Sequence, residues 1–399
     1  MPRYNGGFIG TDGLDAPDPP TAVTPTAGNA QVSVAFTAPT DTGTSAITGF
    51  VAQVSSSGDD YSAGSNTGSS SPIVVSSLSN GTSYTAKVWA INAYGTSAPS
   101  DASSSFTPVQ PPRGLFAGGV VPSFTNKIEY IEISTTGNSS DFGDLSLARR
   151  WLAGASSSTR AVWFSGKTSA LQNIIEYSTI FSLGNTTDFG DLSVICQLGE
   201  ACSSSTRAVH GLGLTGSGAV NTLEYVTISS TGDSTDFGDF TSTDSARGSG
   251  SSSTTRGIFT GLSNSAETNK IEYITIASTG NATDFGDLTV SRYATASTAN
   301  STRSVTIGGL GGGSYRNEMD YITIASTGNA TDFGDQDING GWRAGVASST
   351  RGVVAGANGY IYNMDYITIA SAGNSTDFGS FSNGGESYGS ASSAHGGLS

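Results

Sequence analysis

The sequence predicts an all-β protein, and three observations lead to this fold class. Glycine accounts for 54 of the 399 residues and only 12% of residues are charged, which suits short strands joined by tight turns better than helices. Close copies of one stretch, residues 269–288, recur to the end of the chain. The copies share an Asp-Phe-Gly triplet, and successive triplets are 47, 48, 48, 48 and 45 residues apart. A register this regular indicates structural repeats.

Two markers define six repeats, which begin at Arg113. The aspartates of the triplet are Asp141, Asp188, Asp236, Asp284, Asp332 and Asp377. An arginine keeps the same period, and in five repeats it ends a run of small polar residues; its positions are Arg113, Arg160, Arg207, Arg256, Arg303 and Arg351. Residues that are needed in every repeat are expected to build it. We therefore expect the aspartates to cap turns or to pair with the arginines.

The chain before the repeats has a different organisation. Residues 1–16 show no periodic apolar pattern, so we expect an arm that becomes ordered on meeting a partner. From residue 17 to residue 108, short alternating runs such as Val32, Val34 and Phe36 predict a β-sandwich. Residues 109–112 form a proline-rich linker, and residues 113–399 contain the repeats.

The two ends of the repeat region predict that it closes on itself. Each repeat has three or four short strands, and the segment before its arginine is rich in small residues, as an innermost strand near an axis requires. The first repeat lacks this segment, whereas the chain ends with one, in which His395 stands at the arginine position. Pairing this last strand with the first repeat gives a closed six-bladed β-propeller without open sheet edges. A solenoid would instead need capping repeats.

The stretch from Leu78 to Ser100 resembles the closing half of a fibronectin type III domain. Leu78 and Tyr84 match the leucine and the corner tyrosine of that family, and Tyr94 and Gly95 match the turn before its last strand. Phe36 replaces the early-strand tryptophan, which changes the packing of the core but not the topology. Domains of this family are mostly spacers and adhesion modules, so the resemblance implies no chemistry.

The repeats carry two further resemblances. Their strand order, with glycine pairs at Gly118-Gly119 and Gly308-Gly309 followed by Tyr130 and Tyr321, is similar to Kelch repeats, although the tryptophan of that family is missing. The opening residues, the sandwich and the tandem repeats together resemble structural proteins of tailed bacteriophages, particularly those of marine cyanobacteria. This resemblance implies a non-enzymatic virion protein, a tail fibre or appendage subunit involved in host attachment. The alternatives are a glycan-degrading appendage enzyme and a capsid decoration fibre.

Charge and hydropathy narrow the choice of partners. A net charge of −15 argues against nucleic acid, which needs basic stripes. No apolar run is long enough to span a membrane, and the first residues lack the apolar core of a secretory signal. The resemblance to phage proteins implies a virion location after assembly in the host cytoplasm, contacts of the arm with other virion proteins, and a homo-oligomer.

No catalytic residue, metal or cofactor is expected. The Asp-Phe-Gly triplet lacks the other motifs of a protein kinase, and His210 stands where other repeats have Trp163 or Phe259, which predicts a packed histidine. Calcium bound by Asp284 and Asp287 is an alternative to turn capping. A glycosidase would need two acids in different environments, and the acids found in single repeats are Glu200, Asp244, Glu267 and Asp337. Cys196 and Cys202 are expected to be small, half-buried thiols.

The binding residues are predicted in the loops that differ between repeats, since the shared positions build the fold. Four aromatic residues in these loops, Phe124, Tyr315, Tyr360 and Tyr362, are candidates for stacking on a host-surface glycan or for anchoring a protein. The alternative is that these loops only connect strands or pack on a neighbouring subunit.

Overall fold

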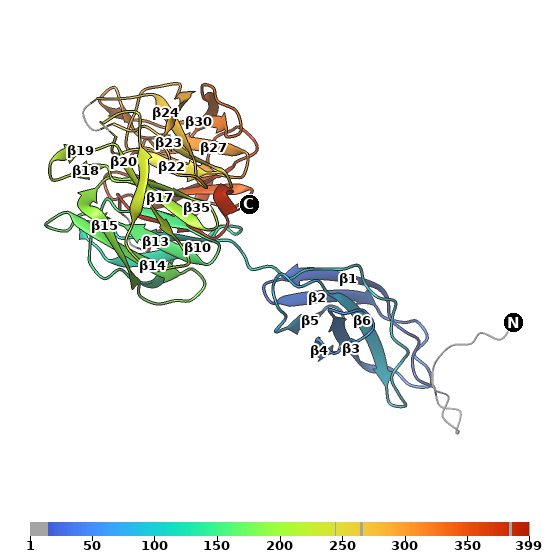
Figure 1. Ribbon diagram of the computed structural model, residues 1–399. Helices are drawn as coiled ribbons and strands as arrows, with labels where there is room; N and C mark the ends of the chain where they lie inside the picture. Colours follow the sequence, from blue (N-terminus) through green and yellow to red (C-terminus); the bar gives the residue numbers. More distant parts are fainter. Residues whose placement is uncertain (1–14, 244, 264–265, 383–384, 399) are drawn as a thin grey trace. The chain divides into compact units, whose positions relative to one another are not determined.

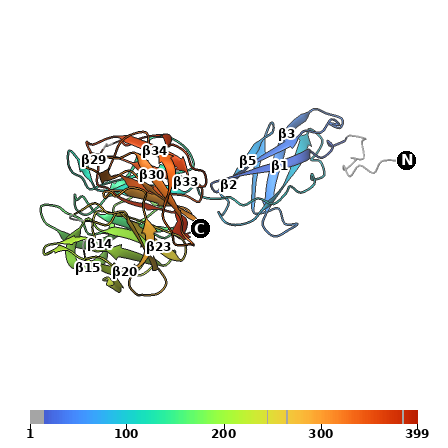
Figure 2. The same cartoon turned by 90° about the horizontal axis from the view of Figure 1, so that it is seen from above.

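The computed structural model describes residues 15–243, 245–263, 266–382 and 385–398, and these residues are all-β. The chain divides into two compact units, residues 1–111 and residues 112–399, which are described separately (Figures 1 and 2). The only helical element among the described residues is the short 3-10 helix η1 (Gly396–Leu398). No helix in this part of the chain is long and apolar enough to cross a membrane. Most of the predicted arm, residues 1–14, lies outside the described residues.

The first unit is a sandwich of two antiparallel sheets. One sheet has the order β1-β2-β5 and the other β4-β3-β6. Their strands are β1 (Thr21–Gly28), β2 (Gln31–Thr37), β3 (Ile47–Ser55), β4 (Gly64–Gly68), β5 (Ile73–Ser76) and β6 (Thr85–Asn92). The predicted alternation on β2 is confirmed, because Val32, Val34 and Phe36 are buried and face the core while their neighbours are more exposed.

Local contacts of the sandwich agree with the residues that suggested its family. The hydroxyl of Tyr84 accepts a hydrogen bond from the Ser79 N–H at 3.1 Å, which is the arrangement of a tyrosine corner. Phe36, at the tryptophan position, packs on Phe50 with ring centroids 4.8 Å apart. The sandwich also includes Asp15, although the sequence predicts it in the arm: its carbonyl oxygen accepts from the Asn92 side chain at 2.9 Å.

The second unit contains six antiparallel sheets, one for each repeat. In each sheet the four strands follow one another outwards from an innermost strand. The first sheet has β36 (Gly389–Ser392), β7 (Arg113–Ala117), β10 (Lys127–Glu132) and β11 (Ser140–Asp144). The second has β12 (Ala153–Ser156), β13 (Arg160–Phe164), β14 (Gln172–Thr179) and β15 (Thr187–Gln197), and the third has β16 (Glu200–Ser203), β17 (Arg207–Gly211), β20 (Thr222–Thr227) and β21 (Thr235–Asp239).

The other three sheets repeat this order. The fourth has β22 (Ser249–Ser252), β23 (Arg256–Thr260), β24 (Lys270–Thr275) and β25 (Thr283–Asp287), and the fifth has β26 (Ala296–Ala299), β27 (Arg303–Ile307), β30 (Glu318–Thr323) and β31 (Thr331–Asp335). The sixth has β32 (Ala344–Ala347), β33 (Arg351–Ala355), β34 (Asn363–Thr368) and β35 (Thr376–Ser380). Short loop strands are β8 (Val120–Val121), β9 (Ser123–Phe124), β28 (Leu310–Gly311) and β29 (Ser314–Tyr315), and β18 (Leu214–Thr215) and β19 (Gly218–Ala219) extend the second sheet beyond β15.

The predicted pairing of the C-terminal strand with the first repeat is present. β36 lies antiparallel to β7, with Gly389 opposite Ala117 and Ser392 opposite Gly114. The innermost strands contact one another in the cyclic order β36, β12, β16, β22, β26, β32 and again β36. The six sheets therefore surround a common axis, and we call this arrangement the six-sheet ring.

Apolar cores lie between neighbouring sheets and also across the closing joint. Phe116 and Ile131 of the first sheet pack with Val353, Met364 and Phe378 of the sixth. The core between the second and third sheets has the same organisation. Since apolar burial is the main favourable term in folding, the joint between the sixth and first sheets is held by the same kind of contact as the other joints.

Candidate binding site at the mouth of the axial channel

The innermost strands enclose a narrow channel along the axis of the six-sheet ring. Three adjoining cavities of about 70, 100 and 80 Å³ lie along it. The strands approach so closely that a Cβ added to Gly154, Gly250 or Gly345 would lie within 2.3 Å of a carbonyl oxygen on the neighbouring strand. This close approach explains why the segment before each arginine consists of small residues.

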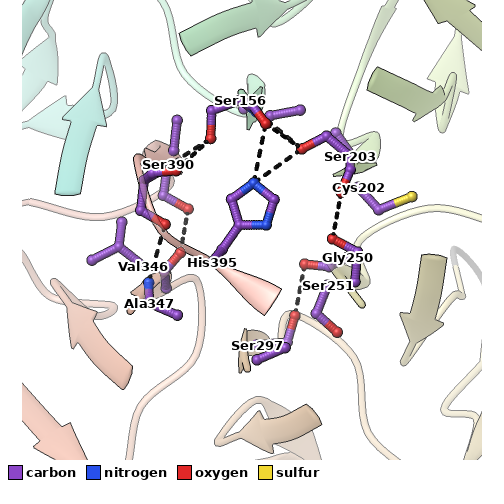
Figure 3. Close-up of a pocket in the computed structure, with 18 of the residues that line it drawn as sticks. Ser156, Cys202, Ser203, Gly250, Ser251, Ser297, Val346, Ala347, Ser390 and His395 are labelled. Carbon is purple, nitrogen blue, oxygen red and sulfur yellow. Dashed lines mark hydrogen bonds between the residues drawn. The ribbon is translucent and has the colours of Figure 1, made fainter. Parts of the chain in front are cut away.

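His395 closes one end of the channel. Figure 3 shows its imidazole at the centre of a circle of residues from the innermost strands. Nε2 lies 3.1 Å from the carbonyl oxygen of Ser156 and 3.2 Å from Oγ of Ser203, and Nδ1 accepts from the Gly397 N–H at 3.1 Å. A neutral imidazole with its proton on Nε2 satisfies these contacts. Burial lowers the pKa of His395 to about 4, so this neutral form persists at physiological pH.

The arginine position of the first repeat is occupied by Arg113, and the expectation that His395 takes it is wrong. The Arg113 N–H donates to Oγ of Ser393, and the Ser393 N–H donates to the Arg113 carbonyl, both at 2.9 Å. Arg160 and Ser157 make the same two bonds in the second sheet. Because Arg113 already completes this turn from another part of the chain, the residues after Ser393 continue into the channel.

The other end of the channel, which we call the mouth, is framed by a closed ring of backbone hydrogen bonds. One residue just before each innermost strand has a left-handed conformation, with φ between 54° and 64°. Each donates its N–H to the carbonyl of the equivalent residue of the preceding sheet, at 2.7–3.1 Å. In order around the axis these residues are Trp151, Leu198, Arg247, Ala294, Trp342 and Ser387. The left-handed conformation directs each of these N–H groups towards the neighbouring sheet, where a carbonyl oxygen accepts it.

Aromatic and charged side chains gather on one side of the mouth. The indoles of Trp151 and Trp342 lie on either side of Ser387, with ring centroids 6.2 Å apart and planes tilted by 44°. The guanidinium of Arg150 lies 3.5 Å from the centroid of the Trp151 ring and 5.0 Å from that of Phe124. We call Phe124, Arg150, Trp151, Tyr315, Trp342 and Glu386 the mouth cluster.

Tyr315 and Glu386 complete this cluster from two further loops. An added Cβ on Gly341 would lie 3.1 Å from the ring of Tyr315, so the tyrosine packs beside Trp342. Burial raises the pKa of Tyr315, and the charge of Glu386 raises it further. Burial also raises the pKa of Glu386, whereas a hydrogen bond from the Gly359 N–H, at 3.2 Å, and the nearby Arg150 lower it.

The structure brings most of the predicted binding residues to this face. Phe124 and Tyr315 belong to the mouth cluster and are half-buried. Tyr360 lies near Arg150 and is 41% exposed, and Tyr362 is 53% exposed on the same loop of the sixth sheet. Sequence reasoning missed Trp151 and Trp342. The signal was present, since the two tryptophans occupy the same position of two different repeats and no other repeat has an aromatic residue there.

The repeated arginines bridge neighbouring sheets. Each guanidinium stacks on the tyrosine of the third strand of its own sheet, at 4.1–4.6 Å from the ring centroid. Each also donates to a backbone carbonyl of the next sheet, as Arg207 does to Ile276 at 3.0 Å. Arg351 of the sixth sheet donates to Ile133 of the first, also at 3.0 Å. The series is therefore cyclic, like the order of the sheets.

The repeated aspartates of the Asp-Phe-Gly triplets do not have the role we expected. Their side chains are exposed on the outermost strands, and within the described residues no turn amide donates to the carboxylate of Asp284. The residue after the turn glycine makes a polar contact to the preceding sheet instead: Asn281 Oδ1 accepts from the N–H of Asp239, the last residue of β21, at 3.1 Å. The described residues contain no group of three or more potential ligands that could hold a metal ion.

Sequence reasoning also missed a set of buried acidic residues on the third strands. Glu176, Asp320 and Asp365 form ion pairs with the buried Arg149, Arg292 and Arg343, at 3.1, 2.9 and 2.9 Å. The equivalents Glu129, Glu224 and Glu272 accept hydrogen bonds from serine or threonine hydroxyls. A buried carboxylate costs free energy unless it is paired or hydrogen-bonded, so these side chains are occupied in holding neighbouring sheets together.

The acids proposed for a glycosidase are not brought together. Glu200 lies in the wall of the channel, where burial raises its pKa to about 8 although the Gly248 N–H donates to it at 2.6 Å. Glu267 and Asp337 are exposed on the fourth and fifth repeats, and Asp244 lies outside the described residues.

His210 is packed as predicted. It is fully buried and stacks on Phe164 with ring centroids 5.0 Å apart, and burial lowers its pKa to about 3. Cys196 and Cys202 are buried free thiols, and burial raises the pKa of Cys196 to about 12.

Comparison with known proteins identifies the first unit. Residues 15–106 match the model of the fibronectin type III domain, so this part of the chain is a fibronectin type III domain. The match begins at Asp15, the first residue seen to bond to the sandwich. No curated protein matches the chain.

Proposed function

We propose that this chain is a non-enzymatic structural protein of a tailed-phage virion, a tail fibre or appendage subunit, and that the mouth cluster attaches it to the host surface. In this proposal the six-sheet ring is a six-bladed, Kelch-like β-propeller and the fibronectin type III domain is a spacer. The tandem repeats and the opening residues support the phage assignment, because they resemble virion proteins of that kind. The single observation that carries the binding role is the mouth cluster itself.

The direction of the chain supports the mouth as the face for attachment. β7 begins at Arg113, beside the turns that contain Ser393, and ends at Ala117 near the mouth. An added Cβ on Gly118, the next residue, would lie 2.5 Å from the Arg149 carbonyl oxygen. The second unit therefore begins, at Pro112 and Arg113, on the face of the ring opposite the mouth.

The glycan-degrading alternative has less support. Hydrolysis of a glycosidic bond generally needs two carboxyl groups about 5–9.5 Å apart on either side of the bond. Of the candidate acids that the structure describes, Glu200 lies within the channel wall, and Glu267 and Asp337 are on different repeats. Glu386 is the only acid in the mouth cluster. This set suits binding better than catalysis.

The proposal is tested with full-length protein on cells. Biotinylated protein, displayed as several copies on labelled streptavidin, is expected to bind a susceptible cyanobacterium, and single copies to bind weakly, because multivalency raises avidity by ~10²–10⁴. The Trp342→Ala variant should lose most of this binding, and Tyr94→Ala, an exposed aromatic on the sandwich, should retain it. Absence of cell binding by the multivalent wild type would refute the attachment role.

The anchor at the other end of the chain needs its own experiment. We propose that residues 1–16 dock on other virion proteins, and that the chain forms a homo-oligomer in the particle. Deleting residues 2–14 leaves Asp15 in the sandwich and should abolish incorporation into particles. Normal amounts of this protein in purified particles of the deletion mutant would reverse the orientation, with the propeller facing the particle. Incorporation at the capsid rather than the tail would favour a decoration fibre.

A further inference from the structure

We propose that the mouth cluster binds an acidic sugar residue, with the carboxylate of the sugar held by Arg150 and a face of its ring against Trp342. This inference rests on the proposed attachment function and specifies the chemistry of the ligand. Its basis is the arrangement of Arg150 between aromatic rings, the small cavity lined by Trp151 and Trp342, and the distribution of charge in the six-sheet ring.

Arg150 is positioned to bind a planar anion. Trp151 and Phe124 lie over its guanidinium, with their ring centroids 3.5 and 5.0 Å away, so stacking uses the faces of the group and leaves its in-plane N–H donors. No hydrogen bond or salt bridge within the described residues uses the Arg150 side chain, and Nε is buried without a partner. A guanidinium fork that is held flat matches the two oxygens of a carboxylate.

The charge of Arg150 is used differently from that of nine other arginines in this unit. The six repeated arginines bridge neighbouring sheets, and Arg149, Arg292 and Arg343 pair with buried carboxylates. Arg150 instead lies at the surface of a chain with a net charge of −15, next to the entrance of the channel. A positive group at the mouth of a chain with a net negative charge gives the mouth a local preference for anions.

The aromatic residues favour a sugar over a peptide or a simple phosphate. Trp342 is half-buried and inclined towards Trp151, which provides an apolar wall for the C–H face of a pyranose. The cavity at the mouth, which Trp151, Trp342 and Arg247 line, has a volume of about 80 Å³, enough for one small substituent of the sugar but not for a peptide chain. Glu386 lies close to Arg150 and can accept hydrogen bonds from sugar hydroxyls.

The test uses full-length protein and polygalacturonate, a polymer of uronic acid, as the probe. Retention of the protein in affinity electrophoresis is measured in gels containing polygalacturonate, its methyl ester, or neutral dextran. We expect retention by polygalacturonate alone. Arg150→Gln should weaken it at least tenfold, Arg150→Lys should weaken it less, and Trp342→Ala should weaken it about tenfold. Lys270→Gln removes an exposed cation on β24, the third strand from the axis, and should change nothing. Unchanged melting temperatures of the variants show that they are folded.

Three outcomes would overturn the inference: no retention by polygalacturonate, equal retention by the methyl ester or dextran, or undiminished retention of Arg150→Gln. The cell-binding experiment separates this failure from failure of the proposed function. If cells are bound and Trp342→Ala abolishes the binding, but uronate polymers are not bound, the mouth binds another ligand and the attachment role stands. If Arg150→Gln leaves cell binding intact while Trp342→Ala removes it, the ligand is not acidic.

Discussion

Replacing Glu200 by glutamine should stabilise the six-sheet ring near neutral pH and change how its stability depends on pH. Glu200 begins the innermost strand β16, at a position where the other five sheets have Ala153, Ser249, Ala296, Ala344 and Gly389. It is 3% exposed, and one of its carboxylate oxygens has no hydrogen-bond partner among the described residues. Glutamine keeps the acceptor for the Gly248 N–H and has no charge to bury.

The magnitude follows from the pKa of Glu200. Burial raises it from 4.5 to about 8, so the folded protein binds a proton that the unfolded chain releases. Stability from this group is therefore full below pH 4.5 and falls as the pH rises towards 8. Each pH unit between the two pKa values changes the free energy of unfolding by about 1.4 kcal/mol. Relative to its value below pH 4.5, the free energy of unfolding of wild type is therefore lower by roughly 1 kcal/mol at pH 5 and by roughly 3 kcal/mol at pH 7. For a unit of this size 3 kcal/mol corresponds to about 6 °C in melting temperature.

Calorimetry of the full chain from pH 5 to pH 8 measures this effect. The transition of the ring in Glu200→Gln should lie above that of wild type by a margin that widens with pH. Glu267→Gln, at an exposed carboxylate, is the control and should run parallel to wild type. If the melting temperatures of wild type and Glu200→Gln changed with pH in parallel, Glu200 would ionise equally in the folded and unfolded chains, and the reasoning would be refuted.

Three further predictions concern the joints between sheets. Deleting residues 386–399 removes β36 and His395 and exposes the core between the first and sixth sheets. The loss should exceed the free energy of unfolding that a domain usually has, ~5–15 kcal/mol, and a monomeric deletion variant with an unchanged melting temperature would contradict this. Arg207→Lys loses the stack on Tyr225 and the bond to Ile276 and should cost about 1–2 kcal/mol, measured by denaturant unfolding of the ring. Asn281→Ala should cost about 1 kcal/mol and Asp284→Ala less than about 0.5 kcal/mol, in chelator or in calcium; the reverse order, or strong stabilisation by calcium, would favour the roles first expected for the aspartates.

The repeat period predicted the six sheets because strand length, turn chemistry and the small innermost residues are all local properties of a repeat. The missing strand of the first repeat likewise predicted the pairing of β36 with β7. The role of the aspartates could not be predicted in this way. The polar contact at each turn joins residues of neighbouring sheets, as Asn281 and Asp239 do, and the sequence of one repeat does not show which polar residue faces the next sheet.

The mouth cluster was only partly predictable for a related reason. Phe124 and Tyr315 were found because they lie in loops that vary. Trp151 and Trp342 are 191 residues apart and meet only because the sheets are arranged around an axis. The three buried ion pairs were missed because Arg149, Arg292 and Arg343 lie in connecting segments of unequal sequence, which do not align with a repeated partner.

The pairing of β36 with β7 inside the first sheet has a consequence for protein engineering. The two strands come from opposite ends of the repeat region, yet they pair as β12 and β13 do in the second sheet, where the chain is continuous. The position of the chain ends is therefore arbitrary with respect to the packing, and a circular permutant that opens at another serine- and threonine-rich turn, such as the one before Arg256, should assemble the same ring once the old ends are linked. Since these turns all lie on the face opposite the mouth, a second protein fused at any of them would leave the mouth uncovered.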